Sequence, residues 1–345
     1  MNHNEVKNYY IEPGQQWEID LFRPEDAEGV RQLFLSVYGE GYPVRTYLEP
    51  SLLIAENAAG STISSVARTA GGEIVGHNAL YHSAPFHGIY ESGAGLVHKD
   101  YRGGHGIFTD LFNHGKGIAA GKFGIEGIFG EAVCNHLFAQ RLTHSSGAAP
   151  HAVEVDLMPS AAYTKEKSAP GRVASLFVFL TIKPKPHRVF LPAVYEAPMR
   201  YLYAGLDDSR DMVLSVDKII DDLPTKIDMQ YFAFAQVGRI CVWEAGRDFE
   251  AVFSLHEKEA LDKGAVILQA SLNLSEPWVG REVDLLKERG YFLCGILPRW
   301  LDADALLMTK IIHRPYWEDI QLYLDRAKRI LEFARVDWER TVKDR

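Results

Sequence analysis

The 345-residue sequence is poor in cysteine and contains no long hydrophobic run. Cys134, Cys241 and Cys294 are widely spaced and form no CxxC pattern, which excludes a disulfide framework and favours a reducing compartment. No apolar segment reaches the length of a membrane span, and the N-terminal residues lack the apolar region of a signal peptide. We therefore expect a soluble, cytoplasmic protein that has no membrane partner.

Positive charge is scarce as well. The chain has 37 Lys and Arg residues against 46 Asp and Glu residues, a formal net charge of -9. Such a chain repels the phosphates of nucleic acids and the headgroups of anionic lipids, so we expect neither as a partner. A local site for one phosphorylated ligand remains compatible with this balance, because a few backbone amides and one Arg suffice to bind it.

Metal-binding motifs are missing too. Nine histidines lie between positions 77 and 151, but no HxxxH or HExxH pair occurs among them. We therefore predict no metal site.

The N-terminal part of the chain predicts a mixed α/β sheet. A strand at 17–23 precedes a helix that opens at Pro24 and carries Val30, Leu33 and Phe34 on one face. The turn Gly71-Gly72 joins two alternating segments into a β-hairpin. The further expected elements are a strand at 90–98, a helix at 106–120, a strand at 124–133, a helix at 135–146 and a strand at 151–158. This order of elements is typical of a mixed α/β fold.

The length suits two domains of about 150 residues each. Residues 159–172 are rich in Ser, Ala, Lys and Pro, as exposed linkers are, and the elements expected beyond them repeat the first half in outline. At the C-terminus, a long amphipathic helix after Pro315 either packs across the domains or forms the seam of a homodimer. The predicted divisions are a domain at 1–165, a connection at 166–190, a domain at 191–313 and the C-terminal helix at 314–345.

A glycine-rich loop, YRGGHGI at 101–107, joins an expected strand to an expected helix. Backbone N–H groups converge at such a junction and the helix dipole lies behind them, so the loop predicts an anion site. The Walker pattern fails here, because Asp110 and Gly117 stand where it requires Gly and Ser or Thr. The dinucleotide fingerprint GxGxxG fails as well, since His98 or Thr109 would occupy its third glycine position.

In its context, this loop resembles that of the GNAT superfamily of acetyl-CoA-dependent N-acetyltransferases. The matching residues are Leu96, Val97, Tyr101, Arg102, Gly103, Gly106 and Ile107. The segment EIVG at 73–76 is similar to the family's third strand, and the resemblance covers roughly residues 15 to 160. It implies acetyl-CoA, or another acyl-CoA, as co-substrate. The cofactor-binding residues that it implies are Leu96, Val97, Arg102, Gly103, Gly104, His105, Gly106, Ile107 and Asn135.

The sequence departs from the family's pattern at two places. The third residue past Arg102 is His105, with Gly106 one position late, as if the loop contained one extra residue. The helix after the fifth strand lacks the Tyr that usually protonates the departing thiolate, and has Leu142, Thr143 and His144 instead. The usual general acid is therefore missing.

The resemblance implies direct attack of an amine on the thioester, which needs a base, an oxyanion donor and a proton for sulfur. Glu91 and Glu131, on the two strands that flank the thioester in the family, are the expected carboxylates. A solvated, outward-facing carboxylate would account for each of them equally well. His136 and His144 are the candidates for proton transfer, although either could be structural. Cys134 is more typical of a buried, inert thiol than of a nucleophile.

The second half resembles a GNAT domain that has lost its cofactor site, because residues 243–248 offer one glycine and two acids where the loop would be. An unrelated α+β domain is the alternative. The predicted function is N-acyl transfer from acetyl-CoA to a small or peptide amine. The alternatives are a catalytically silent acyl-CoA-binding or ligand-binding sensor and a scaffold that binds no CoA. Tyr38, Tyr42 and Tyr47 suggest an aromatic wall for the acceptor, which exposed loop tyrosines would explain as well.

Overall fold

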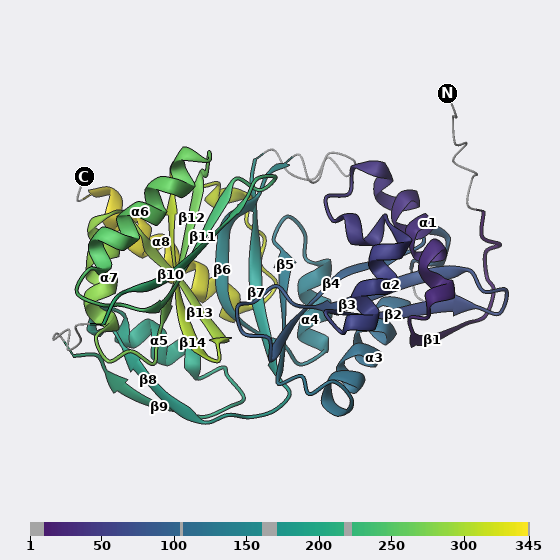
Figure 1. Cartoon of the computed structure of the whole chain (residues 1–345), viewed down its shortest axis with the longest axis horizontal. Coiled ribbons are helices and arrows are strands. Elements are labelled where there is room, and N and C mark those ends of the chain that lie inside the picture. Colours follow the sequence, from purple (N-terminus) through teal and green to yellow (C-terminus); the bar gives the residue numbers. More distant parts are fainter. Residues whose placement is uncertain (1–9, 104–105, 161–170, 217–222, 344–345) are drawn as a thin grey trace. The chain divides into compact units, whose positions relative to one another are not determined.

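The computed structural model describes residues 10–103, 106–160, 171–216 and 223–343, apart from the side chains of residues 119 and 120. The chain divides into two compact units. One comprises Met1–Ser83 and His87–Ile128, and the other comprises Ala84–Phe86 and Phe129–Arg345. Both units combine a β-sheet with helices (Figure 1), which confirms the predicted mixed α/β class. The predicted domain boundaries stay a prediction.

The first unit holds four antiparallel strands in the order β1-β2-β3-β4. They are β1 (Trp17–Leu21), β2 (Thr62–Thr69), β3 (Ile74–Tyr81) and β4 (Ile89–Val97). Its helices are α1 (Ala27–Tyr38), α2 (Pro50–Ala59) and α3 (Ile107–Gly121). The predicted hairpin is β2–β3, and the predicted strand and helix on either side of the glycine loop are β4 and α3.

Alternation along the strands separates two hydrophobic clusters in this unit. Val66, Ile74 and Leu96 pack with residues of α1 and α2. Their sequence neighbours Ala67, Val75 and Val97 pack instead with Ile107 and Leu111 of α3. Successive residues of a strand point to opposite faces, so α1 and α2 cover one face of the sheet and α3 covers the other. Strand β4 therefore contributes to both cores immediately before the glycine loop.

The second unit is built on a longer sheet, in the order β5-β7-β6-β13-β14-β12-β11-β10. Its strands are β5 (Gly127–Val133, which begins at the unit boundary), β6 (Ala149–Met158), β7 (Val173–Thr181), β10 (Lys226–Phe232), β11 (Val237–Glu244), β12 (Ile267–Asn273), β13 (Phe292–Leu301) and β14 (Ala303–Ile311). Its helices are α4 (Phe138–Ser145), α5 (Glu196–Tyr203), α6 (Phe249–Asp262), α7 (Val279–Glu288) and α8 (Asp325–Lys343). One arrangement occurs twice, since β7 lies between β5 and β6 as β14 lies between β12 and β13.

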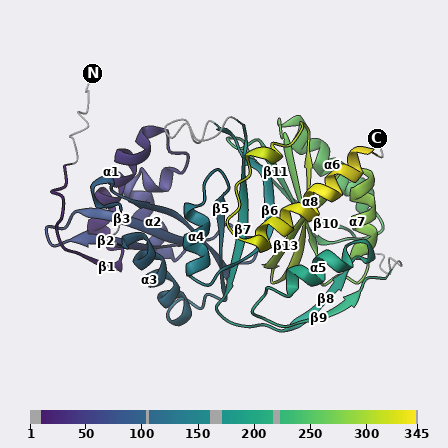
Figure 2. The ribbon, with the colours of Figure 1, turned by 180° about the vertical axis from the view of Figure 1, so that it is seen from behind.

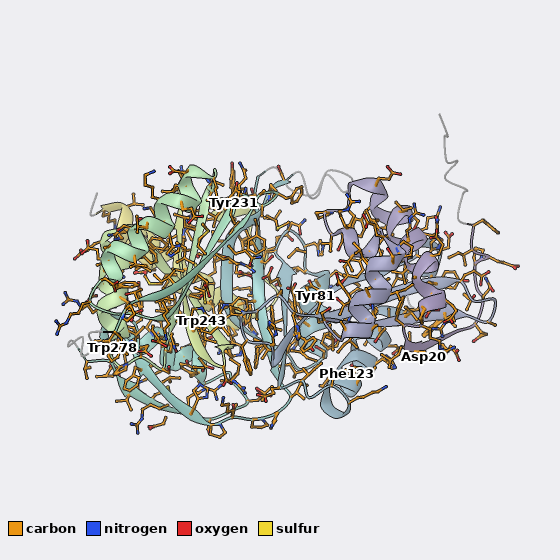
Figure 3. All side chains as sticks on the ribbon, viewed as in Figure 1. Asp20, Tyr81, Phe123, Tyr231, Trp243 and Trp278 are labelled. Carbon is orange, nitrogen blue, oxygen red and sulfur yellow. The ribbon has the colours of Figure 1, made fainter. Side chains whose placement is uncertain are left out.

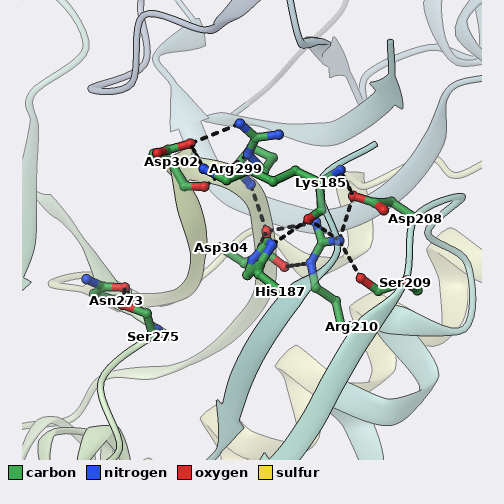
Figure 4. A network of polar contacts seen from close by, with 10 residues as sticks. All are labelled: Lys185, His187, Asp208, Ser209, Arg210, Asn273, Ser275, Arg299, Asp302 and Asp304. Carbon is green, nitrogen blue, oxygen red and sulfur yellow. Dashed lines mark hydrogen bonds and ion pairs between the residues drawn. The ribbon is translucent and has the colours of Figure 1, made fainter. Parts of the chain in front are cut away.

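A buried ion network fixes a separate parallel ribbon, β8 (His187–Leu191) with β9 (Arg210–Leu214). The Asp304 carboxylate is fully buried and accepts hydrogen bonds from Arg210 Nε at 2.7 Å and from the backbone N–H of Arg299 at 2.9 Å (Figure 4). Arg210 also donates to Asp208 at 2.7 Å. The charges of Arg210 and Asp304 are therefore paired where water does not reach them.

Helix α8 corresponds to the predicted C-terminal amphipathic helix but begins at Asp325, about ten residues later than predicted, because residues 317–319 form only a 3-10 turn. It lies across β6 and β13 (Figure 2). Its buried face carries Ala327, Ile330 and Ala334, whereas the opposite face carries mainly charged residues. The helix thus packs on its own unit through its apolar face. No helix in the described ranges is long and apolar enough to cross a membrane.

Candidate functional site

The glycine loop lies in the first unit, where β4 passes into α3. Gly103 and Gly106 adopt φ values of 82° and 71°, the left-handed region in which residues with a Cβ are strained. A Cβ on Gly103 would meet no atom within 4 Å, and one on Gly106 would meet only Asp110 Oδ2 at 3.7 Å. Backbone conformation, rather than space, therefore requires glycine at both positions. Gly104 and His105, which the sequence places in the same site, lie outside the described residues.

Gly106 is the N-cap of α3 and, as a glycine, contributes no side-chain cap to this helix end. The carbonyl of Gly106 accepts the N–H of Asp110 at 2.9 Å, so the helical hydrogen bonds begin there. The first N–H groups of α3 consequently point out of the helix along its dipole, as an anion site requires. The exposed Asp110 carboxylate in the first turn is the one feature that opposes a bound anion.

Flanking residues hold the loop in place. The buried Tyr101 donates its hydroxyl to the carbonyl of Glu12 at 2.5 Å. Arg102 Nε donates to the carbonyl of Val97 at 2.8 Å, so its guanidinium folds back toward β4. The side chains of Leu96, Val97 and Ile107 belong to the two hydrophobic clusters. These three predicted cofactor residues can therefore reach a ligand only through their backbone.

Strand β4 carries a β-bulge at Ala94 and Gly95, close to its end at Val97. In the pairing with β3, Leu96 stands opposite His77 and Gly93 opposite Ala79, so Ala94 and Gly95 together face one residue. Ala94 has a φ of 50°, which is unusual for a residue with a Cβ. A bulge removes a backbone group from the regular ladder and re-aims the strand. The sequence signal was Gly-Ala-Gly at 93–95, inside a predicted strand.

Glu91 precedes the bulge on β4 and is held by two hydroxyl groups. Tyr81, labelled in Figure 3, donates to its Oε1 at 2.7 Å, and Ser83 donates to its Oε2 at 2.5 Å. Burial, with a contribution from the charge of Glu91, raises the pKa of Tyr42 and Tyr47. This carboxylate is thus oriented within the first unit, and the sequence reasoning missed both of its hydroxyl partners.

The three tyrosines expected to line an acceptor site join one aromatic cluster. Phe34 stacks on Tyr47 with ring centroids 4.8 Å apart, and Tyr42 lies 5.0 Å from Phe34 and 4.9 Å from Tyr38. Tyr47 is buried, whereas Tyr38 is 38% exposed. The cluster therefore presents Tyr38 to solvent and uses Tyr47 as core.

Glu131 lies in the second unit, on β5, and pairs with an arginine from β11. Arg239 Nη2 donates to Glu131 Oε1 at 2.8 Å and approaches Glu154 Oε1 at 3.3 Å. Arg239 Nε also donates to Gln269 Oε1 at 2.8 Å. Glu131 is therefore part of a polar network that ties β5 and β6 to β11 and β12.

The remaining predicted residues lie at the two ends of α4, also in the second unit: Asn135 and His136 precede the helix, and His144 is in its last turn. Gln321 Nε2 donates to the carbonyl of Asn135 at 3.1 Å, which places residues near 321 against the segment before α4. The buried Nδ1 of His136 has no hydrogen-bond partner in the described part of the chain. His144 is exposed, with its ring centroid 6.2 Å from that of Tyr323. Burial raises the pKa of Cys134, as expected of an inert thiol.

The turn between β11 and α6, where a second glycine loop would lie, is filled by the chain itself. A Cβ on Gly246 would come within 1.9 Å of the carbonyl oxygen of Leu223. The N–H of Gly246 donates to Thr225 Oγ1 at 2.9 Å, and the N–H of Thr225 donates to Asp248 Oδ1 at 3.0 Å. Trp278, labelled in Figure 3, closes the turn by donating to the carbonyl of Ala245 at 3.1 Å. Backbone and side chains of the chain thus fill this turn.

The residues that the structure describes contain no group of three or more His, Cys, Asp or Glu that could hold a metal ion. Several histidines of the N-terminal half have other described contacts, such as the stacked rings of His82 and His87. His114 Nδ1, for example, lies 2.8 Å from Ser65 Oγ.

No protein-family model and no curated protein matches the sequence. Among solved structures, mutant forms of the spermidine/spermine N-acetyltransferase SpeG from Vibrio cholerae match 48% of this chain and 95% of their own, with 14% identity and a TM-score of 0.39. The structure of yncA, a putative acetyltransferase from Salmonella typhimurium with its cofactor acetyl-CoA, matches 49% of this chain and 96% of its own, with 14% identity and a TM-score of 0.40. A putative acetyltransferase of the GNAT family from Desulfovibrio desulfuricans matches 48% and 99%, with 15% identity and a TM-score of 0.38. This likeness covers about half of the chain and concerns the fold alone.

Proposed function

We propose that this protein is an N-acyltransferase that moves an acetyl or other acyl group from acyl-CoA to an amine while both substrates are bound. The observation that carries the proposal is the N-terminus of α3, entered from β4 through Gly103 and Gly106 in left-handed conformations. Backbone amides with a helix dipole behind them suit a pyrophosphate. Asp110 would weaken this site, which favours a cofactor with further contacts along β4 over a free anion.

In the proposed reaction, Glu91 accepts the proton of the acceptor's ammonium group. The amine nitrogen then bonds to the thioester carbon as the carbon–sulfur bond breaks, and the excess proton on that nitrogen passes to the departing thiolate, which leaves as the free thiol. Tyr81 and Ser83 fix the carboxylate of Glu91. Backbone N–H groups at the β4 bulge are the proposed donors to the thioester oxygen, where negative charge develops. Glu131, His136 and His144 stay predictions for proton transfer, and Asn135 stays a prediction for cofactor binding.

We further propose that strands β10–β14 with α6 and α7 form a second, degenerate GNAT-like repeat. The support is the shared arrangement of β5-β7-β6 and β12-β14-β13, together with the order strand, helix, strand, helix and two closing strands. The filled turn at Gly246 explains why this repeat would bind no CoA.

The test is acetyl-CoA binding followed by thiol release. Acetyl-CoA should raise the melting temperature, because a ligand that binds only the folded state stabilises it. With an accepted amine, Glu91→Gln should lower kcat by about 10²-fold to 10⁴-fold, since a general base contributes that much, and should leave the KM for acetyl-CoA unchanged. Glu28→Gln, an exposed substitution on α1, is the matched control.

The outcomes separate the competing functions. If millimolar acetyl-CoA did not change the melting temperature, both functions that require CoA binding would be excluded, and the scaffold that binds no CoA would be favoured. Binding without thiol release across a panel of small and peptide amines would favour the silent ligand-binding protein. Equal rates for the parent and Glu91→Gln would remove Glu91 as the base, and Glu131→Gln, His136→Gln and His144→Gln in the same assay would then identify its replacement.

A further inference from the structure

A histidine of β3 lies under the bulge of β4. His77 is fully buried, and its Nδ1 is 2.9 Å from the carbonyl oxygen of Ala94, the residue with positive φ. Its Nε2 is 3.1 Å from Ser64 Oγ on β2. One imidazole therefore connects three neighbouring strands, and it contacts the bulge itself rather than the regular ladder beside it.

The two contacts determine which nitrogen carries the proton. A carbonyl oxygen only accepts hydrogen bonds, so Nδ1 must be the donor to Ala94. Burial lowers the pKa of His77 to about 4, which keeps the ring neutral at physiological pH. In a neutral imidazole with a proton on Nδ1, Nε2 is an acceptor, and the hydroxyl of Ser64 donates to it. The two contacts require the same single tautomer.

The imidazole is itself held from several sides. The Phe34 ring packs edge-on at 5.4 Å and the Tyr47 ring at 5.3 Å, measured between centroids. Asn57 of α2 fixes Ser64 in turn, because its Oδ1 accepts the N–H of Ser64 at 2.8 Å and its Nδ2 donates to Ser64 Oγ at 3.3 Å. A rigid chain of contacts thus runs from α2 through Ser64 and His77 to the bulge.

The bulge needs such a support. A residue with a Cβ at positive φ is strained and persists only where its surroundings hold it. We infer that His77 is a positioning residue, which holds the Ala94 bulge in place and thereby aims the backbone of β4 beside Glu91 toward the thioester. The catalytic part of this inference rests on the proposed function, but the structural part does not.

The test compares His77 variants with a matched histidine. His114 of α3 makes a similar contact with a serine hydroxyl, Ser65, and does not touch the bulge, so His114→Leu controls for the loss of a His–Ser pair. His77→Leu should lower kcat about 10-fold to 100-fold, the effect of a misaligned reacting group, with the KM for acetyl-CoA within about twofold. His77→Gln, which can both donate to Ala94 and accept from Ser64, should restore most of kcat. His77→Asn, which is too short to do both, should not.

Two readouts do not depend on activity. Imidazole NMR should show the proton on Nδ1 of His77 and a titration midpoint near pH 4. Amide hydrogen exchange at residues 93–96 should speed up in His77→Leu and His77→Asn but not in His114→Leu. If His77→Leu fails to fold, the comparison of His77→Gln with His77→Asn decides by the same criteria.

A proton on Nε2, or unchanged exchange at the bulge in His77→Asn, would overturn the inference. Equal kcat values for His77→Gln and His77→Asn would overturn its catalytic part. If the parent enzyme releases no thiol with any amine, the proposed function fails, while hydrogen exchange still tests whether His77 holds the bulge.

Discussion

Individual buried side chains make the stability of this protein depend on pH, and His77 is the sharpest case. Its pKa is lowered to about 4 by burial, whereas an unfolded histidine titrates near its ordinary value of about 6.5. As the pH falls below 6.5, His77 binds a proton in the unfolded chain, whereas His77 in the folded protein stays neutral. The contribution of neutral His77 to the free energy of unfolding is therefore fully present above pH 6.5 and is lost progressively toward pH 4.

Between pH 7 and pH 5, His77 should cost the protein about 2 kcal/mol of unfolding free energy. His77→Gln has no such proton to bind, so its unfolding free energy should fall by that much less over the same interval. Urea unfolding of the parent and the variant at both pH values measures the difference. Equal decreases in unfolding free energy in the two proteins would contradict the lowered pKa of His77.

Asp304 changes stability in the same direction but at lower pH, because its pKa is also lowered. Burial alone would raise the pKa of Asp304, but hydrogen bonds and charge from His187 and Arg210 outweigh it. The ionised Asp304 contributes to the free energy of unfolding above the ordinary aspartate pKa of about 3.9. This contribution is lost as the pH falls below that value. Asp304→Asn should therefore cost about 3 kcal/mol at pH 7, since it leaves buried Arg210 poorly compensated.

A neighbouring residue in Figure 4 supplies the control for this prediction. Asp302 pairs with Lys185 and Arg299, but its side chain is 48% exposed. Asp302→Asn should cost less than about 1 kcal/mol, because solvent screens exposed ion pairs. Chemical unfolding at pH 7 and near pH 3 should show a gap between parent and Asp304→Asn that narrows in acid. A constant gap would mean that ionisation is not the cause.

At the scale of elements, the glycine loop and the helix behind it can be tested with two substitutions of one kind. Gly106→Ala places a Cβ on a residue at φ 71°, so we expect a loss of about 1 kcal/mol in stability and about tenfold in acetyl-CoA affinity. Gly117→Ala lies inside α3, where a Cβ meets no atom within 4 Å, and should gain about 0.5 kcal/mol without altering affinity.

Calorimetric titration and thermal unfolding of both variants test this pair of expectations. If Gly106→Ala bound acetyl-CoA as tightly as the parent, the conformation of the loop would not matter for the cofactor.

The elements with strong patterns could be predicted from the sequence, and those with weak patterns could not. The β2–β3 hairpin, β4, α3 and α8 follow from alternation, glycine turns and helical periodicity. Helix α2 was missed because aromatic residues obscure its start, although Pro50 at its first position is a common opening. The β8–β9 ribbon was missed because the Arg210–Asp304 pair that anchors it joins residues 94 positions apart.

For the molecule as a whole, the proposed function predicts one acetyl-CoA per chain. The proposal assigns the coenzyme to the junction at Gly106, because at the matching turn the N–H groups of Gly246 and Thr225 already donate to Thr225 Oγ1 and Asp248 Oδ1. Isothermal titration should give a stoichiometry near one. A value near two would show that the turn at Gly246 opens and binds a second acetyl-CoA. Thr225→Ala should then increase the affinity of this second binding step.

The candidate site was only partly predictable. The loop and Glu91 follow from local sequence, but the partners that orient Glu91 come from β3 and the segment after it. The pairing of Glu131 with Arg239 spans 108 residues, and nothing in the sequence around either one indicates it. Contacts of this kind are fixed by strand register, which a single sequence does not specify.

The turn at Gly246 also bears on how such a sheet is assembled. A stretch of polypeptide, Leu223 to Thr225, supplies there the oxygen atoms that a dissolved anion would otherwise bring. That end of α6 is consequently complete as soon as the chain has folded, at any cellular level of coenzyme. If α3 binds coenzyme as proposed, its corresponding end is complete only in the bound state, so depletion of coenzyme should make the first unit, and not the second, more susceptible to proteolysis.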